Sequence, residues 1–342
     1  MVEPSPVMVR RPARGRCIAL TGACSFLGTN LIGMLEEDDA ISRIVALDVA
    51  RPPSGGPKTR LYEVDLTLPT ADERVAEILA AESVDTLLHM AFLSSPSHNA
   101  TWAHELESVG SMHLLNGARQ APLKHLVLWS QTWLYGAKPS NPNFLTEDYP
   151  LAADPHEPYF ADKIAAEREV ARYALQKPET VVTVLRTAPI VGPTVHNFMT
   201  RYLRQRLALT LLGFDPLWQF VHEVDAVAAF KMAIDRPEPG IFNIVSDDVL
   251  PLSKVLRFSG CVAAPLLHLV AKPFATLMWT AQLGPLPPGF LPHLRYVCAA
   301  DGHQAAEVLG FHAAYSSQEA LMDLVTARRL RDARLARRTG GA

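Results

Sequence analysis

The 342-residue chain has few cysteines, no marked excess of either charge and no long hydrophobic run. Its four cysteines, at positions 17, 24, 261 and 298, form neither a CxxC pair nor a spacing typical of metal ligands. We therefore expect no disulfide framework and no metal, and we expect a reduced, cytoplasmic setting. The formal net charge of -3 likewise gives no indication of a nucleic-acid partner.

The longest apolar stretches fall short of a membrane span. Cys261–Val270 and Phe274–Leu283 are broken up by Pro265, Lys272 and Pro273, and neither reaches the ~20 residues that a span needs. We interpret both as core helices of a small second lobe. An apolar cap over a substrate pocket, or a membrane-facing surface, is the alternative.

Both ends of the chain are rich in arginine. Met1–Arg16 has four arginines but no apolar core, which argues against a secretory signal and predicts a flexible arm. Residues 327–338 hold six arginines and predict a solvated, frayed helix. A weak contact with an anionic surface is the alternative for that end.

What the sequence does contain, with 49% hydrophobic and 20% charged residues, is an alternation of strand and helix patterns typical of a globular chain. Strands are predicted at Cys17–Thr21, Arg43–Asp48, Leu61–Val64, Val84–Met90, His125–Trp129 and Val181–Leu185. Helices are predicted at Leu27–Leu35, Ala71–Ala81, Thr101–Arg119 and Pro158–Leu175. This order predicts an α/β fold, a Rossmann-type doubly wound parallel sheet with a smaller, mostly helical lobe that caps the substrate.

The regular alternation of strand and helix patterns ends after Pro193. We expect an amphipathic helix at Arg201–Leu212, and strands at Gln219–Val221 and Ile241–Val245 that return to the sheet. The predicted boundaries are an arm at 1–15, a dinucleotide-binding domain at 16–192 and 219–246, a substrate lobe at 193–218 and 247–326, and a basic tail at 327–342.

The first strand leads into a short loop with glycine at both ends, Gly22 and Gly28, before a helix begins. Unpaired N–H groups and the helix dipole make such a helix start suitable for a pyrophosphate. Gly22 permits the sharp turn, and a Cβ there is expected to meet the pyrophosphate, while Gly28 permits close packing of helix on strand. Ser25 stands at the middle glycine position of a Gly-x-x-Gly-x-x-Gly loop, where its hydroxyl can bond a phosphate oxygen.

The second strand ends in Asp48, 20 residues after Gly28. A carboxylate at this place accepts hydrogen bonds from the adenosine ribose and repels a 2′-phosphate, which favours NAD over NADP. Arg51 nearby is the alternative, because it can receive a 2′-phosphate.

Tyr159 and Lys163 lie four residues apart in a helical pattern that opens at Pro158. The spacing places both side chains on one face of the helix. An ammonium and an oxidised nicotinamide beside a phenol favour the phenolate, so such a tyrosine can act as an acid or base near neutral pH.

With these motifs the chain resembles the extended short-chain dehydrogenase/reductases, the NAD-dependent epimerase/dehydratase family, over roughly residues 16–250. The resemblance rests on Thr21–Gly28, Asp48, Asp65 with Leu66, His89–Ala91, Gly110–Leu115, Leu134–Gly136, Tyr159 with Lys163, Leu185–Pro193, Phe220–His222 with Asp225, and Phe242–Ile244.

The resemblance implies a role for each matching residue. The cofactor would be bound by Gly22, Ser25, Phe26, Leu27, Gly28, Asp48, Ser130 and Pro189, with Asp65 and Leu66 bordering the adenine and Met90 and Ala91 lining the cofactor path. Tyr159 would be the acid/base. Lys163 would bond the nicotinamide ribose and lower the pKa of Tyr159.

Three positions depart from the family pattern. Gln131 takes the place of the second hydroxyl residue that assists the tyrosine, and Thr132 can replace that hydroxyl only if the turn shifts by one residue. Glu107 stands where the family often has Asn. Trp218 stands where sugar-nucleotide enzymes often have an Arg that grips the diphosphate. Without that Arg the site lacks a bidentate phosphate anchor. Arg201, Arg204 and Arg206 remain as candidate anion contacts.

We therefore predict an NAD-dependent oxidoreductase, epimerase or dehydratase acting on a hydroxyl or keto group of a sugar nucleotide or a less polar alcohol. Tyr159, Lys163, Gln131 and Thr132 are the candidate catalytic residues. The alternative is a non-catalytic dinucleotide-binding sensor or scaffold, which Gln131 favours. The expected partner is a small-molecule substrate; an enzyme on a lipid-like alcohol at a membrane surface, and a homodimer, are left open.

Overall fold

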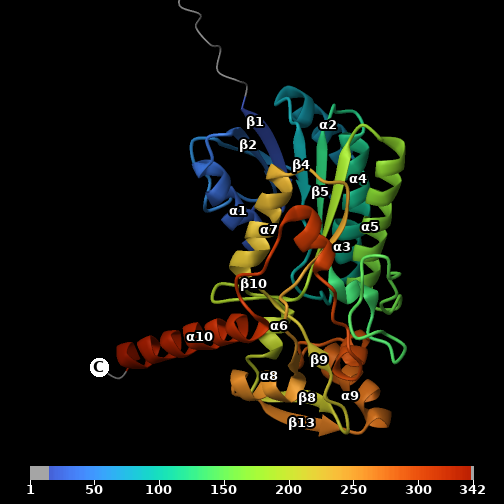
Figure 1. Cartoon of the computed structure of the whole chain (residues 1–342), viewed down its shortest axis with the longest axis vertical. Coiled ribbons are helices and arrows are strands. Elements are labelled where there is room, and N and C mark those ends of the chain that lie inside the picture. Colours follow the sequence, from blue (N-terminus) through green and yellow to red (C-terminus); the bar gives the residue numbers. More distant parts are fainter. Residues whose placement is uncertain (1–14, 340–342) are drawn as a thin grey trace, which may run out of the picture.

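The computed structural model describes residues 15–339, with side chains described up to residue 331. Its centre is a seven-stranded sheet in the order β11-β6-β5-β4-β1-β2-β3, and every neighbouring pair is parallel (Figure 1). The strands are β1 (Arg16–Thr21), β2 (Ile41–Asp48), β3 (Thr59–Glu63), β4 (Thr86–His89), β5 (His125–Gln131), β6 (Val181–Thr187) and β11 (Gly240–Ile244). The predicted Rossmann-type α/β fold is confirmed.

Helices cover both faces of this sheet. On one face α1 (Phe26–Glu37) packs beside α7 (Glu223–Asp235), and on the other lie α2 (Ala71–Ala81), α4 (Gly110–Ala118) and α5 (Pro158–Gln176). Side chains of one strand alternate between the faces, so that Ile18 and Leu20 of β1 join one hydrophobic core and Cys17 and Ala19 join the other.

The helix predicted at Thr101–Arg119 is divided. It begins as α3 (Ala100–His104), passes through a π-helical turn η1 (Glu105–Val109) and continues as α4. Wide turns of this kind are rare and are found mostly at functional sites. Glu107 lies in the π-helical turn and is almost fully buried.

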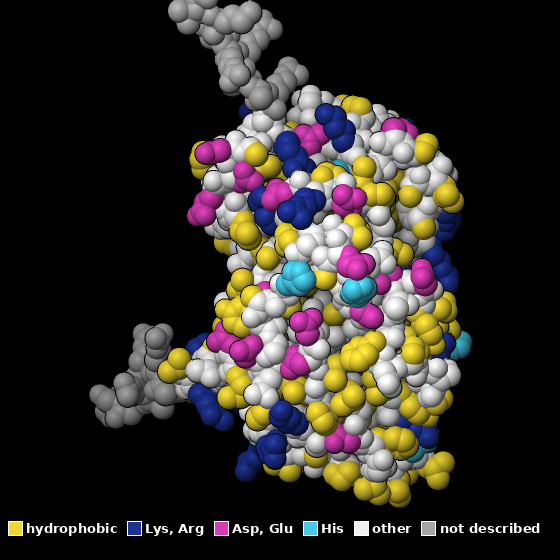
Figure 2. Space-filling view, in the orientation of Figure 1, with side chains coloured by type: hydrophobic (Ala, Val, Ile, Leu, Met, Phe, Trp, Pro, Cys, Tyr) yellow, Lys and Arg dark blue, Asp and Glu magenta, His cyan; other side chains and the backbone are white. Residues whose placement is uncertain are grey.

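The second lobe corrects two predictions. Arg201–Leu212 is not a helix: α6 (Phe198–Tyr202) ends early, and β8 (Leu207–Leu211) pairs in parallel with β13 (Val262–Leu266). Cys261–Val270 therefore contains a strand, because its pairing partner 55 residues away supplies hydrogen bonds that a local pattern cannot reveal. The lobe also contains α8 (Leu252–Ser259) and α9 (His268–Thr280). Figure 2 shows hydrophobic side chains gathered at the lower end of the molecule, over β13 and α9.

Short elements join the two parts. The strands are β7 (Ile190–Val191) with β10 (Val221–His222), and β9 (Leu217–Trp218) with β12 (Leu250–Pro251). Residues 219–221 therefore do not return to the main sheet as predicted, whereas the strand predicted at Ile241–Val245 does, as β11. The remaining turns and helix are η2 (Thr132–Tyr135), η3 (Pro288–Leu294), η4 (Ala305–Leu309) and α10 (Ser317–Thr339).

The ends of the chain are described only in part. The arm predicted at the N-terminus lies, up to residue 14, outside the described residues, and the arginine-rich end forms the second half of α10. Within residues 15–339, no helix combines the length and the apolar character needed to cross a bilayer.

Candidate active site

The glycine loop between β1 and α1 is held by contacts within the protein. Gly22 has a φ of +69°, a conformation that favours glycine, and a Cβ added there would lie 2.6 Å from the carbonyl oxygen of Met90. A Cβ at Gly22 would therefore clash with the chain that follows β4, in addition to the contact with a pyrophosphate that the sequence predicts. A Cβ on Gly28 would lie 2.3 Å from the carbonyl oxygen of Gly22. Ser25 caps α1, and its Oγ accepts a hydrogen bond of 3.0 Å from the N–H of Gly28.

Asp48 at the end of β2 is tied to the same loop. Its Oδ2 accepts a hydrogen bond of 2.8 Å from the N–H of Cys24, and its Oδ1 accepts one of 2.8 Å from the N–H of Val49. The hydrogen bond between Cys24 and Asp48 therefore holds the glycine loop against the end of β2. Each carboxylate oxygen has a further lone pair for a hydroxyl donor.

Four other predicted cofactor residues follow the ends of β3 and β4. Asp65 accepts hydrogen bonds from the N–H and the hydroxyl of Thr67, and Leu66 is buried. The N–H groups of Met90 and Ala91 donate to the hydroxyl of Thr21, which joins β4 to β1. These residues therefore lie at the carboxyl edge of the sheet, where the glycine loop also begins.

Tyr159 and Gln131 meet across the site, from α5 and from the end of β5. The Gln131 Nε2 lies 3.1 Å from the Tyr159 hydroxyl, and the Gln131 Oε1 lies 3.3 Å from it. Tyr159 is only 4% exposed, and burial raises the pKa of its phenol well above the ordinary value. The hydroxyl therefore keeps its proton in this state of the protein.

Lys163 does not reach toward solvent. Its Nζ forms a 2.6 Å ion pair with Glu107 Oε1 and lies 3.7 Å from the centre of the Tyr159 ring. Glu107 Oε1 also accepts a 2.6 Å hydrogen bond from the N–H of Leu93. Burial lowers the pKa of Lys163 and raises the pKa of Glu107, and each partner opposes the shift of the other. The other oxygen, Glu107 Oε2, is buried without a hydrogen-bond partner among the described residues.

Two of the predicted site residues, Ser130 and Thr132, have hydrogen-bond partners other than Tyr159. The Ser130 hydroxyl donates a 2.5 Å hydrogen bond to Glu167 Oε2, and Glu167 in turn pairs with the buried Arg186. Thr132 is buried in η2, and its carbonyl faces Cys298. Gln131, and not Thr132, therefore stands beside Tyr159, so the turn has not shifted by one residue.

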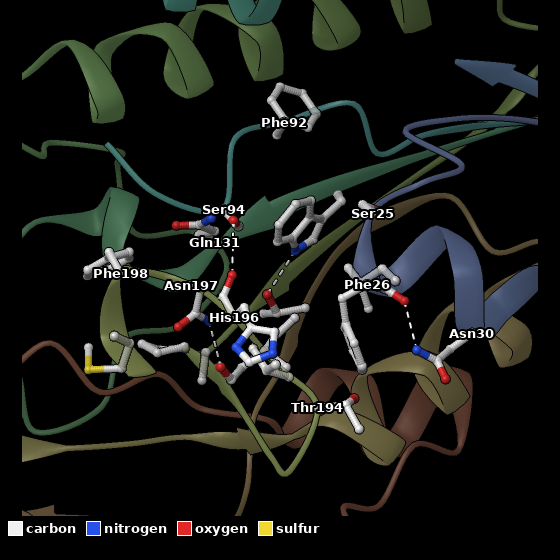
Figure 3. Close-up of a pocket in the computed structure, with 18 of the residues that line it drawn as sticks. Ser25, Phe26, Asn30, Phe92, Ser94, Gln131, Thr194, His196, Asn197 and Phe198 are labelled. Atoms are coloured by element: carbon white, nitrogen blue, oxygen red, sulfur yellow. Dashed lines mark hydrogen bonds between the residues drawn. The ribbon is translucent and has the colours of Figure 1, made fainter. Parts of the chain in front are cut away.

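A cavity of about 620 Å³ joins the glycine loop to this tyrosine. Figure 3 shows Ser25 and Phe26 on one side and Gln131 and Phe198 across from them. Leu27 and Pro189 also line it, as do Phe92, Trp129, Trp133, Tyr159, His196 and Asn197. Among the described residues, the lining contains no Asp, Glu, Lys or Arg. The predicted residues Gly22, Gly28, Asp48, Asp65, Leu66, Met90, Ala91, Ser130, Thr132 and Lys163 do not line it.

Aromatic packing closes the cavity on the side of the second lobe. Trp133 stacks on His293 with 4.2 Å between ring centres, and Trp218 donates a 2.9 Å hydrogen bond from Nε1 to the carbonyl of His293. Trp218 is thus a buried packing residue, and the candidate anion contacts Arg201, Arg204 and Arg206 do not line the cavity either.

The sequence did not reveal three features of this site: the Glu107–Lys163 ion pair, the Trp133 wall and the loop that carries His196. Glu107 was recognisable as a departure from the family pattern, but its partner lies 56 residues away. His196 gave no signal, because a single histidine in a loop is common.

Comparisons with known proteins identify the family and several relatives of this chain. The model of the NAD dependent epimerase/dehydratase family matches residues 18–245. An uncharacterised protein of Mycobacterium tuberculosis is 32% identical over 260 residues, which are 74% of this chain and 68% of that protein. A 3-diazoavenalumate denitrifying reductase of a Streptomyces species is 24% identical over 259 residues, 72% of this chain and 82% of that enzyme.

Solved structures agree in fold. The structure of UDP-glucose 4-epimerase from Thermotoga maritima, with UDP-glucose, gives a TM-score of 0.70 at 19% identity and covers 92% of this chain and 99% of that one. At this level of identity the likeness supports the fold alone.

Proposed function

Because this chain belongs to the NAD-dependent epimerase/dehydratase family, we propose that it is an NAD-dependent oxidoreductase for a hydroxyl or keto group on a small, uncharged and largely apolar substrate. The observation that carries this proposal is the cavity beside Tyr159, whose described lining combines many aromatic and aliphatic side chains with polar ones such as Gln131 and Asn197 and contains no Asp, Glu, Lys or Arg. The start of α1 can receive the pyrophosphate of NAD, but the described lining offers no Lys or Arg to bind the second diphosphate that a sugar nucleotide would bring.

Two features fit NAD. The α1 start, with Ser25, Phe26 and Leu27, faces the cavity, where its N–H groups can receive a pyrophosphate. Beside Lys163, Glu107 Oε2 is buried without a hydrogen-bond partner in the described part of the chain, and as an acceptor it would suit a ribose hydroxyl. When bound, NAD supplies the hydride acceptor or donor, and the protein supplies position and proton transfer.

Tyr159 would exchange a proton with the substrate oxygen. Its raised pKa favours the neutral phenol, which is suited to protonating a keto oxygen as that oxygen gains negative charge. Once the proton has left, the Gln131 amide can donate its N–H to the phenolate at the distance of 3.1 Å already present. Gln131 would thereby stabilise the phenolate in place of the family's hydroxyl.

Lys163 would act on Tyr159 through the ring face, because its ammonium lies over the aromatic ring. The ion pair with Glu107 holds the ammonium over the ring. The negative charge of Glu107 also reduces the effect of the ammonium on the pKa of Tyr159. The state of Tyr159 in this structure is therefore the protonated one, which is the form that would donate a proton to a keto oxygen.

A matched pair of tyrosines tests the role of Tyr159. Tyr159→Phe removes one hydroxyl and should lower turnover about 10²–10⁴-fold while NAD affinity is kept. Tyr173→Phe, on the same helix and equally buried, should leave turnover unchanged. The assay follows the absorbance of reduced nicotinamide with apolar ketones and alcohols and with nucleotide sugars, and uses product analysis for redox-neutral epimerisation.

Full activity in Tyr159→Phe would contradict the acid/base role. Turnover of nucleotide sugars alone would contradict the substrate class. NAD binding without turnover of any tested compound would favour the non-catalytic sensor.

We further propose that NAD binds more tightly than NADP, because the Asp48 carboxylate would meet a 2′-phosphate with like charge. Asp48→Asn keeps an acceptor oxygen for the N–H of Cys24 but removes the charge, so it should narrow the difference between the two cofactors. Calorimetric titration of both cofactors measures this. Tighter binding of NADP by the parent protein would instead favour Arg51 as the determinant.

A further inference from the structure

The second lobe contains basic but no acidic residues over most of its length. Residues 194–214 and 249–300 include no Asp and no Glu, although acids are frequent in the rest of the chain. The same two stretches carry seven lysines and arginines: Arg201, Arg204, Arg206, Lys254, Arg257, Lys272 and Arg295. These two stretches are therefore positively charged, and the acids of the lobe lie outside them, at positions 215, 247, 248, 301, 307, 319 and 323.

Helix α9 of this lobe exposes its large apolar side chains. It buries the small residues Ala271 and Ala275, whereas Leu269 is 90% exposed and Leu277 is 64% exposed. A helix of a globular protein normally turns its larger apolar residues toward the core. The orientation of α9 thus leaves surface that the described chain does not cover.

Large apolar side chains are also exposed on the neighbouring strands and loops. Besides Leu269 and Leu277, we define this apolar face by Leu207, Val262, Leu267, Val270, Phe274 and Leu283, all of them exposed. Figure 2 shows hydrophobic side chains gathered at the end of the molecule where β13 and α9 lie. Three residues of the apolar face also line an apolar cavity of about 260 Å³ between α9 and β8, namely Leu207, Phe274 and Leu283. Exposed apolar surface of this kind marks an interaction site.

Cations stand in and around the apolar face. Lys272 lies within α9, Arg206 directly precedes β8, and Arg257 lies on α8, just before β13. All three are exposed, and no described acid forms an ion pair with any of them. Large apolar side chains beside unneutralised basic ones are the pattern of helices that lie in the interface of an anionic membrane.

We propose that the apolar face of the second lobe docks on the surface of an anionic lipid bilayer. The residues Leu269 and Leu277 would enter the boundary between headgroups and acyl chains, and Lys272 and Arg206 would contact the anionic headgroups. A second copy of the chain fits less well, because a symmetric contact would bring two like-charged faces together. The proposal does not depend on the chemistry at Tyr159.

Vesicle flotation tests the proposal with the full chain. The protein should float with vesicles of phosphatidylcholine and phosphatidylglycerol in equal parts, should float less at high salt, and should float poorly with phosphatidylcholine alone. The double variant Leu269→Glu/Leu277→Glu should bind the anionic vesicles more than about tenfold less tightly, because burial of one leucine is worth about 1.5–3 kcal/mol and each 1.4 kcal/mol is tenfold.

The matched control is Leu175→Glu on α5 of the sheet domain, where Leu175 is 85% exposed. This variant should float like the parent, and thermal melting with NAD titration should show that all variants are folded. Absence of flotation in the parent, or equal loss in Leu175→Glu, would overturn the proposal. A dimer in sedimentation that only the double variant dissociates would also overturn it, since a second copy would then cover the face. Flotation does not measure activity, so a loss of oxidoreductase activity in Tyr159→Phe would not alter the expected flotation of any variant.

Discussion

Two helices of similar length and similarly apolar sequence, α1 in the sheet domain and α9 in the second lobe, pack in opposite ways. Helix α1 buries Leu27, Leu31, Ile32 and Leu35. Helix α9 buries only two alanines and leaves its leucines outside. The difference is one of partners: α1 has a sheet and α7 to pack on, whereas α9 lies at the end of the molecule.

This comparison shows that apolar content alone does not identify a core. The interpretation of Cys261–Val270 as a core helix was wrong, because it contains an exposed strand. Phe274–Leu283 is mostly helical, as predicted, but belongs to the outward-facing α9 and not to the core. Hydrophobic patterns indicate which residues can be buried, but the surrounding elements decide whether anything buries them.

A pair of glycines gives the largest expected contrast between the two regions. Gly22 and Gly260 have nearly the same backbone angle, with φ of +69° and +72°, but a Cβ on Gly260 meets nothing within 4 Å. Gly260→Ala should therefore cost only the left-handed conformation, about 1–2 kcal/mol. Gly22→Ala should cost clearly more in unfolding free energy and should also weaken NAD binding, because Met90 blocks the Cβ.

Urea unfolding of both variants, with and without NAD, measures this contrast. Equal destabilisation by the two substitutions would show that the turn at Gly22 can shift away from β4, and the loop would then be less constrained than the contacts imply.

Leucines in the two helices give a smaller contrast. Leu31→Ala in α1 removes a side chain that is 1% exposed and should cost about 2–5 kcal/mol of stability. Leu269→Ala in α9 should change stability by less than about 0.5 kcal/mol. Chemical denaturation in the absence of lipid is the measurement, and a large loss for Leu269→Ala would mean that the apolar face is covered in solution.

Much of the first domain could be predicted from the sequence. The alternation of patterns predicted each of the seven strands of the sheet apart from their ends, but it also added residues 219–221, which lie outside the sheet. The bounds of α2 were predicted without error. The glycine loop and the Tyr159–Lys163 spacing were recognisable because each depends on residues close together in the chain. Local hydrogen bonding and side-chain direction fix such features without reference to the rest of the molecule.

By itself, then, the sequence determined the βαβ framework, the loop at Gly22 and the shared helix face of Tyr159 and Lys163. Only the tertiary structure decided that Lys163 pairs with Glu107, that β8 pairs with β13 and that α9 faces outward. Each of these depends on segments more than fifty residues apart, or on the absence of a covering element. Periodicity records which face of an element is apolar, but contacts between distant segments depend on how the whole chain packs.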